Sequence, residues 1–198
     1  SKRMRLIDTH SHLFLEEFSE DFPQVIERAR AAGVTHIFMP NIDSTTIEAM
    51  LSACSLYKGY CFPMIGLHPT SVNANYEKEL EIVARELKFS KEYVAIGEIG
   101  MDLYWDKTYL KEQQIVLDKQ VNWALEYDLP VVIHCRDAFD YIYKVLEPYK
   151  KTPLRGIFHS FTGTAEEATR VLEFSDFFIG INGVVTFKKS HLPEILAG

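Results

Sequence analysis

The amino-acid sequence predicts an α/β fold of the TIM type, a (β/α)8 barrel, on three observations. Short apolar, β-branched runs alternate with longer segments of helical periodicity. The alternation repeats at intervals of about 30 residues, the size of one strand-helix-strand unit. Polar residues gather where the apolar runs end, and barrel enzymes keep their active sites at the carboxyl ends of their strands. An open doubly wound sheet is the competing architecture, but no glycine-rich phosphate loop follows the first run.

Seven strands are expected, and each should be parallel to the next because a helix separates them. They cover residues 6–12, 35–40, 61–67, 93–100, 130–135, 156–161 and 177–185. A (β/α)8 barrel of about 250 residues needs one strand more. The sequence therefore predicts a barrel whose eighth strand is missing from residues 1–198. These residues are expected to form a single domain.

Helices are expected between the strands, at residues 19–32, 44–57, 77–87 and 109–127. Ser19 is the predicted cap of the first helix, and Gly33 its stop. Asp137 and Thr164 are the predicted caps of the fifth and sixth helices, and a last helix should follow Ser190.

The composition excludes several classes of protein. Lys and Arg number 21 against 28 Asp and Glu, a net charge of −7, whereas proteins that grip many phosphates are usually basic. The three cysteines form no CxxC pair, which favours a reducing, cytoplasmic location. No apolar run is as long as a membrane span.

Metal-ligating residue types occur at the predicted strand ends. They are His10 and His12 after the first strand, His68 after the third, Glu98 in the fourth, His134 in the fifth and His159 in the sixth. Two histidines two residues apart on a strand face the same way and can share an ion. His36 and His191 fit no strand end and are interpreted as structural or surface residues.

The set of His10, His12, Glu98, His134 and His159 is too large for one tetrahedral zinc ion. It suits two divalent ions, with Glu98 in contact with both. Two such ions can hold a phosphodiester, activate a water molecule and stabilise the leaving oxygen. We therefore expect a centre of two divalent metal ions, which could be zinc, magnesium or manganese.

Five motifs together resemble the TatD family of metal-dependent deoxyribonucleases. They are IDTHSHL, GLHP, AIGEIGMDLYW, PVVIHCRDA and HSFTGT. The resemblance runs from Leu6 to about Val185, nearly the whole sequence. The resemblance implies a TIM-type barrel, a divalent-metal site and hydrolysis of DNA phosphodiesters, often as a 3′→5′ exonuclease. By position it implies that His10, His12, His134 and His159 are ligands, and that Glu98 is the bridging carboxylate.

The same resemblance gives roles to residues that bind substrate. His68 matches a histidine near the substrate phosphate, with a role in catalysis beside Glu98. Arg136 follows His134 by two residues, so it should face the same side and hold a phosphate, although a surface salt bridge is the other interpretation. Tyr104 and Trp105 could stack on a nucleobase or simply pack over the barrel mouth.

One departure from the family pattern stands out. The family's last ligand is an aspartate on the eighth strand, and the sequence to Gly198 contains no such motif. We therefore expect a longer protein in which the first and seventh strands do not pair directly. The alternative function is a related barrel hydrolase that acts on amides or lactones, although such enzymes often bridge their metals with a carboxylated lysine.

Overall fold

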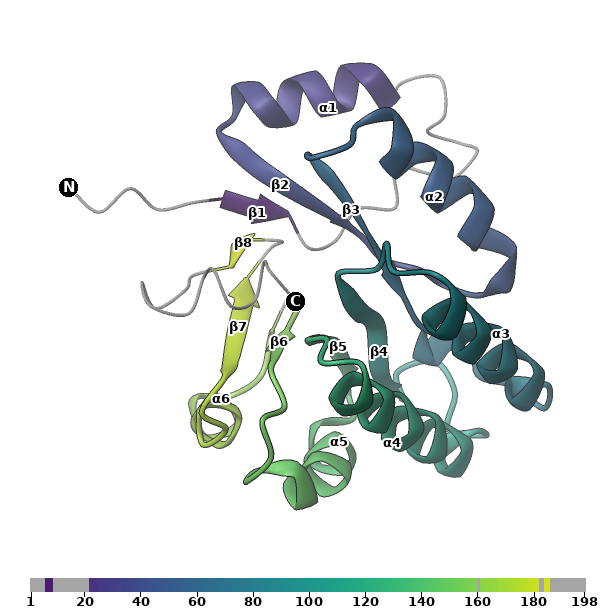
Figure 1. The fold of residues 1–198 in the computed structure, drawn as a ribbon. Helices are drawn as coiled ribbons and strands as arrows, with labels where there is room; N and C mark the ends of the chain where they lie inside the picture. The colour runs from purple at the N-terminus through teal and green to yellow at the C-terminus, as the bar shows by residue number, and fades with distance from the viewer. Residues whose placement is uncertain (1–5, 9–21, 160, 182–183, 186–198) are drawn as a thin grey trace.

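The computed structural model describes residues 6–8, 22–159, 161–181 and 184–185. Within these ranges a curved sheet carries helices on its outer, convex side (Figure 1). None of the described helices combines the length and the apolar character that a membrane crossing requires.

Seven strands follow one another in the sheet in chain order, and every neighbouring pair among them is parallel. They are β1 (Leu6–Asp8), β2 (Val34–Met39), β3 (Cys61–Ile65), β4 (Ala95–Asp102), β5 (Val131–Arg136), β6 (Gly156–Phe158) and β7 (Phe177–Ile181). Sequential parallel pairing with outer helices is the order of strands in a barrel and differs from that of a doubly wound sheet. The predicted fold class is thus confirmed.

The helices occupy the predicted intervals. They are α1 (Phe22–Ala31), α2 (Ile47–Leu56), α3 (Tyr76–Phe89), α4 (Leu110–Glu126), α5 (Phe139–Leu146) and α6 (Ala165–Leu172). Three short 3₁₀ turns accompany them: η2 (Ser44–Thr46), η3 (Pro69–Ser71) and η4 (Glu147–Tyr149). Ser19 and the helix expected after Ser190 lie outside the described residues.

One predicted helix cap is confirmed and another is wrong. The Thr164 hydroxyl accepts a hydrogen bond from the Glu167 backbone N–H, and the Glu167 carboxylate accepts one from the Thr164 N–H. This reciprocal pair is the capping box. At α5 the residue in the cap position is Ala138, and no side chain caps the helix; Asp137 has a positive φ of 51° and belongs to the preceding turn.

The prediction of one strand over residues 177–185 is wrong. The chain turns back after β7, and β8 (Val184–Val185) pairs with it in the antiparallel direction. In the described part of the chain β1 pairs only with β2, and β8 lies beside β1 (Figure 1). The first and seventh strands therefore do not pair directly, and β8 lies between them.

Buried apolar side chains lie on both faces of the sheet because the side chains of a strand alternate between the faces. Odd-numbered residues such as Ile37, Ile65 and Ile133 belong to the large cluster shared with the helices. A smaller cluster on the other face contains Phe38, Met64, Ala95 and Val132. This second cluster gives the inner face of the sheet an apolar floor.

Two buried glutamines of α4 hold the strand ends that carry polar residues. The Gln120 side chain accepts a hydrogen bond from the Leu67 N–H at 2.8 Å and donates one to the Leu67 carbonyl at 3.3 Å. Gln113 does the same for Asp102, at 2.8 and 3.1 Å. The two glutamines are seven residues apart, about two helical turns, so they lie on one face of α4. The segments after β3 and at the end of β4 are thus both fixed to one helix.

The first prediction concerns the contact between β4 and β5. Gly100 has a φ of 138°, and a Cβ there would overlap the carbonyl oxygen of His134. We expect Gly100→Ala to lower the free energy of unfolding by at least about 2 kcal/mol, because it combines backbone strain with a collision. Urea denaturation measures the loss.

The matched control is Gly59→Ala. Gly59 also has a positive φ, 86°, but a Cβ there would meet no atom within 4 Å. Its loss should be about 1 kcal/mol, from backbone strain alone. Equal losses in the two variants would show that the strands can separate to accept the methyl group.

The second prediction concerns Gln120. Gln120→Leu leaves the buried N–H and carbonyl of Leu67 without their partner, so the free energy of unfolding should fall by about 2 kcal/mol or more. Asn122→Ala, on the exposed side of the same helix, removes one hydrogen bond to the Asp118 carbonyl and should cost less than about 0.5 kcal/mol. Thermal or urea unfolding of both variants measures the two losses of stability. If Gln120→Leu costs no more than Asn122→Ala, the hydrogen bonds of Gln120 to Leu67 do not stabilise the fold.

Candidate metal centre

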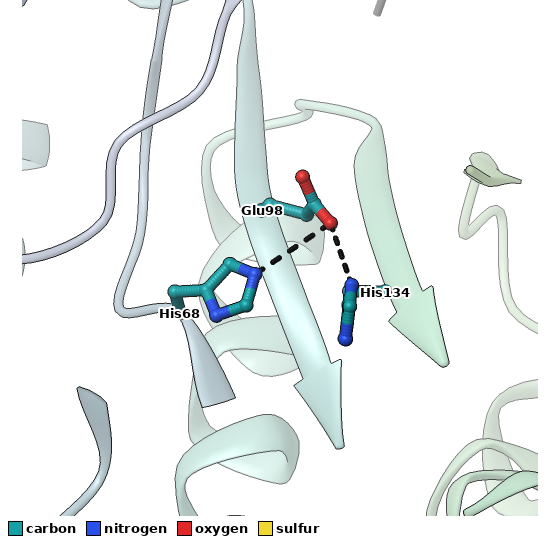
Figure 2. A group of neighbouring side chains, drawn as sticks. All are labelled: His68, Glu98 and His134. Carbon is teal, nitrogen blue, oxygen red and sulfur yellow. Dashed lines mark hydrogen bonds and ion pairs between the residues drawn. The ribbon is translucent and has the colours of Figure 1, made fainter. Parts of the chain in front are cut away.

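Three side chains from neighbouring strands meet at the carboxyl edge of the sheet. Glu98 lies in the middle of β4, His134 is near the end of β5, and His68 directly precedes η3 after β3. Parallel strands in sequence order bring their carboxyl ends to one edge, which places these residues together. Figure 2 shows both imidazoles directed at the Glu98 carboxylate.

The distances within this group are short. Glu98 Oε1 lies 2.9 Å from His134 Nδ1 and 3.7 Å from His68 Nε2. The two histidine rings are 4.7 Å apart between their centroids. One ligand atom from each residue lies within 4.8 Å of the other two. A single ion could therefore contact all three.

The Glu98 carboxylate is fully buried, with none of its surface exposed. Transfer of an isolated carboxylate out of water costs several kcal/mol or more unless a cation or hydrogen bonds compensate. The side chains of His68 and His134 are 10% and 22% exposed and form the boundary between Glu98 and solvent. A carboxylate at this position therefore needs hydrogen bonds or a cation from the residues at this edge.

His134 lies between two carboxylates. Its Nδ1 contacts Glu98, and its Nε2 is 2.8 Å from Asp102 Oδ2. Burial alone would lower the pKa of His134, but the hydrogen bonds and negative charges of Glu98 and Asp102 outweigh it and raise the pKa above its usual value.

Asp102 determines which nitrogen of His134 faces Glu98. Asp102 Oδ2 accepts the Nε2–H, so in the neutral imidazole the Nδ1 lone pair faces the Glu98 oxygen at 2.9 Å. Two acceptors in contact require a proton or a metal ion between them. A carboxylate that orients a histidine in this way is usual for metal-binding histidines.

Sequence reasoning did not identify Asp102. The signal was present: Glu98 and Asp102 are four residues apart on one strand, so they share a face of the sheet. Gly100, between them, pairs with His134 across the two strands. The shared face could be predicted from the spacing, but the contact with His134 depends on the pairing register of β4 and β5, which the sequence alone does not give.

His68 differs from His134 in its hydrogen bonds. Its Nδ1 accepts from the Thr70 backbone N–H at 3.2 Å and lies 2.7 Å from the Thr70 hydroxyl. An accepting Nδ1 leaves the proton of a neutral imidazole on Nε2, the atom that faces Glu98. His68 is therefore better suited to donate a hydrogen bond to an anion, whereas His134 is suited to bind a metal ion.

The residues present fit a divalent metal ion. Glu98 and His134 supply one oxygen and one nitrogen ligand, a combination that suits zinc and other first-row divalent metals. Asp102 holds the ligating histidine in orientation, and the apolar cluster around Met64 and Val132 lies under the same face of the sheet. Additional ligands are needed, because a metal site takes at least three protein groups.

The remaining predicted residues are placed differently. His10 and His12 lie outside the described residues. His159 directly follows β6 and is buried, but it is not a member of the three-residue group found in the described part of the chain. His36, interpreted as structural, contacts the Thr35 hydroxyl and stacks on Phe62.

Arg136 is exposed, and its guanidinium carbon lies 3.8 Å from the centre of the Tyr104 ring. No carboxylate among the described residues forms an ion pair with it, so the surface salt bridge considered as an alternative is not seen there. Cys135 is half-buried, and burial raises the pKa of its thiol to about 12. The thiol is thus protonated at neutral pH and a poor nucleophile.

Comparison with known proteins relates the chain to one family. Residues 7–197 match the family described as TatD related DNase. The chain is 35% identical over 189 residues to the uncharacterized metal-dependent hydrolase YabD of Bacillus subtilis. This match covers 96% of this chain and 73% of YabD. The chain is 33% identical to the 3′-5′ ssDNA/RNA exonuclease TatD of a Pantoea species, with 91% and 68% covered.

A solved structure has a similar fold. The crystal structure of the TatD homologue YjjV of Escherichia coli superposes with a TM-score of 0.80 at 31% identity, over 88% of this chain and 67% of that one. The chain belongs to the TatD-related DNase family of metal-dependent hydrolases.

Proposed function

We propose that the protein is a divalent-metal-dependent hydrolase that cleaves phosphodiester bonds of DNA, as a deoxyribonuclease acting from 3′ ends of single strands. The observation that carries the proposal is the buried Glu98 carboxylate with His134 on one side and His68 on the other. The relatives named 3′-5′ ssDNA/RNA exonuclease support this substrate class.

Glu98 and His134, together with His10, His12 and His159, are the proposed ligands of two divalent ions. Bound there, the ions would supply Lewis-acid stabilisation of developing charge and lower the pKa of a water molecule. Glu98 anchors the ligand set and orients the attacking water. Asp102 keeps the proton of His134 on Nε2 and so keeps Nδ1 available.

His68 and Arg136 are proposed to bind the substrate phosphate. The Nε2–H of His68 points to the site, because Nδ1 is occupied by Thr70. Arg136 belongs to the same strand face as His134, two residues further toward the carboxyl edge. A guanidinium and an imidazole N–H can together neutralise and orient a phosphodiester.

A second candidate is hydrolysis of amides or lactones in small molecules. It is compatible with the descriptions of YabD and YjjV as metal-dependent hydrolases. Activity on single-stranded DNA, single-stranded RNA, a dipeptide and a lactone, each with and without chelator, separates the two candidates. The cytoplasmic location stays a prediction from the cysteine content.

The third prediction concerns Glu98. Glu98→Gln should lower kcat/KM on single-stranded DNA by at least about 100-fold, because an amide neither anchors a cation nor accepts a proton as a carboxylate does. Circular dichroism should show that the fold survives. Glu126→Gln, an exposed change at the end of α4, is the control and should retain activity. Near wild-type turnover by Glu98→Gln would show that the carboxylate has a structural role and no role in catalysis.

The fourth prediction concerns Asp102. Asp102→Ala removes the acceptor that orients His134, so the affinity for Zn²⁺ or Mn²⁺ should fall about 10- to 100-fold. Isothermal titration calorimetry of the metal-free protein measures this directly. Asp106→Ala, in the exposed loop that follows, should bind metal like the wild type. Unchanged affinity in Asp102→Ala would show that His134 does not need this partner.

A further inference from the structure

Two large aromatic side chains lie exposed immediately after the metal-centre strand. Tyr104 is 50% exposed and Trp105 is 76% exposed, although tryptophan is usually largely buried. Their rings meet edge to face, with centroids 4.6 Å apart and planes at 89°. Most of the Trp105 side chain thus remains accessible to solvent beside Tyr104.

Arg136 completes this cluster from the neighbouring strand. Its guanidinium lies over the Tyr104 ring at 3.8 Å and is 5.6 Å from the Trp105 ring. A guanidinium stacked on a ring uses its π face, so its N–H donors remain in the plane and free for a phosphate. The cluster thus offers an open aromatic face beside an oriented cation.

The cluster is fixed to the metal centre by hydrogen bonds. The Tyr104 N–H donates to Asp102 Oδ1 at 3.1 Å, and Oδ2 of the same carboxylate holds His134. The Leu103 N–H donates to the Arg136 carbonyl at 3.0 Å. One aspartate therefore positions both the proposed metal ligand and the backbone that carries the aromatic pair.

We propose that Trp105, Tyr104 and Arg136 form a nucleobase subsite for the end of a single strand of nucleic acid. Trp105 stacks on the base, Tyr104 supports Trp105 and Arg136, and Arg136 binds the phosphate that enters the metal centre. The proposal rests on the proposed nuclease function and deepens it. A small amide or lactone has no extended π face that would need this platform, whereas every nucleobase has one.

The test compares a single-stranded DNA 10-mer that has an ordinary 3′-terminal nucleotide with one that has an abasic 3′ terminus. The metal-loaded wild type should cleave the ordinary substrate with a kcat/KM about tenfold or more above that of the abasic one. Trp105→Ala should lose this difference, mainly through KM on the ordinary substrate, and Trp105→Phe should keep most of it. Phe89→Ala, an equally exposed aromatic on α3, is the control and should behave as the wild type.

A second measurement does not depend on turnover. A 10-mer with phosphorothioate linkages at its 3′ end should quench the tryptophan fluorescence of the metal-loaded wild type, and Trp105→Phe should remove most of that quenching. Cleavage of DNA with equal kcat/KM for ordinary and abasic ends, and no quenching, would overturn the subsite and leave the nuclease function intact. Hydrolysis of the dipeptide or lactone without cleavage of DNA or RNA would overturn both.

Discussion

The carboxylate of Glu98 imposes the main constraint on this protein, because it is fully buried on the inner face of the sheet. A charge in that position is tolerated only when hydrogen bonds or a cation compensate it. The strands on either side place two imidazoles against it, with His134 Nδ1 at 2.9 Å and His68 Nε2 at 3.7 Å from Glu98 Oε1. His134 is in turn oriented by its hydrogen bond to Asp102. The position of Glu98 thus depends on contacts among four residues.

The contacts among Glu98, His134 and Asp102 depend on a close approach of β4 and β5. Gly100 has no side chain where its Cβ would meet the His134 carbonyl, and the two strands pair there in register. Gln113 and Gln120 fix the ends of β4 and β3 to one helix. The site is thus built on regular elements whose backbones are held by buried hydrogen bonds, which suits a centre that must keep its geometry while ions bind.

Local sequence patterns were sufficient for most strands and helices, because apolar periodicity and turn residues depend on near neighbours. The glutamate and two of the histidines at the edge were also predicted, since parallel strands bring their ends together. The hairpin after β7 was missed although its sequence signal was present, because the Asn182-Gly183 pair between apolar residues is typical of a two-residue hairpin turn and was read as part of one strand. Asp102, Gln113 and Gln120 were missed because their partners lie on other elements, up to 53 residues away in the case of Gln120 and Leu67.

The acidic balance of the chain limits how a nucleic acid could bind. With a net charge of −7, long-range attraction cannot bring a polyanion to the protein as it does for basic nucleic-acid-binding proteins. In the proposed function, attraction is therefore local, from metal ions held by Glu98 and His134 and from Arg136. Binding that relies on few phosphates needs another source of free energy, and the proposed stacking on the exposed Trp105 ring would supply it without adding charge. The negative net charge and the proposed aromatic subsite are compatible for this reason: stacking would favour an unpaired strand end, whereas the net charge would disfavour unspecific binding of the rest of the polymer.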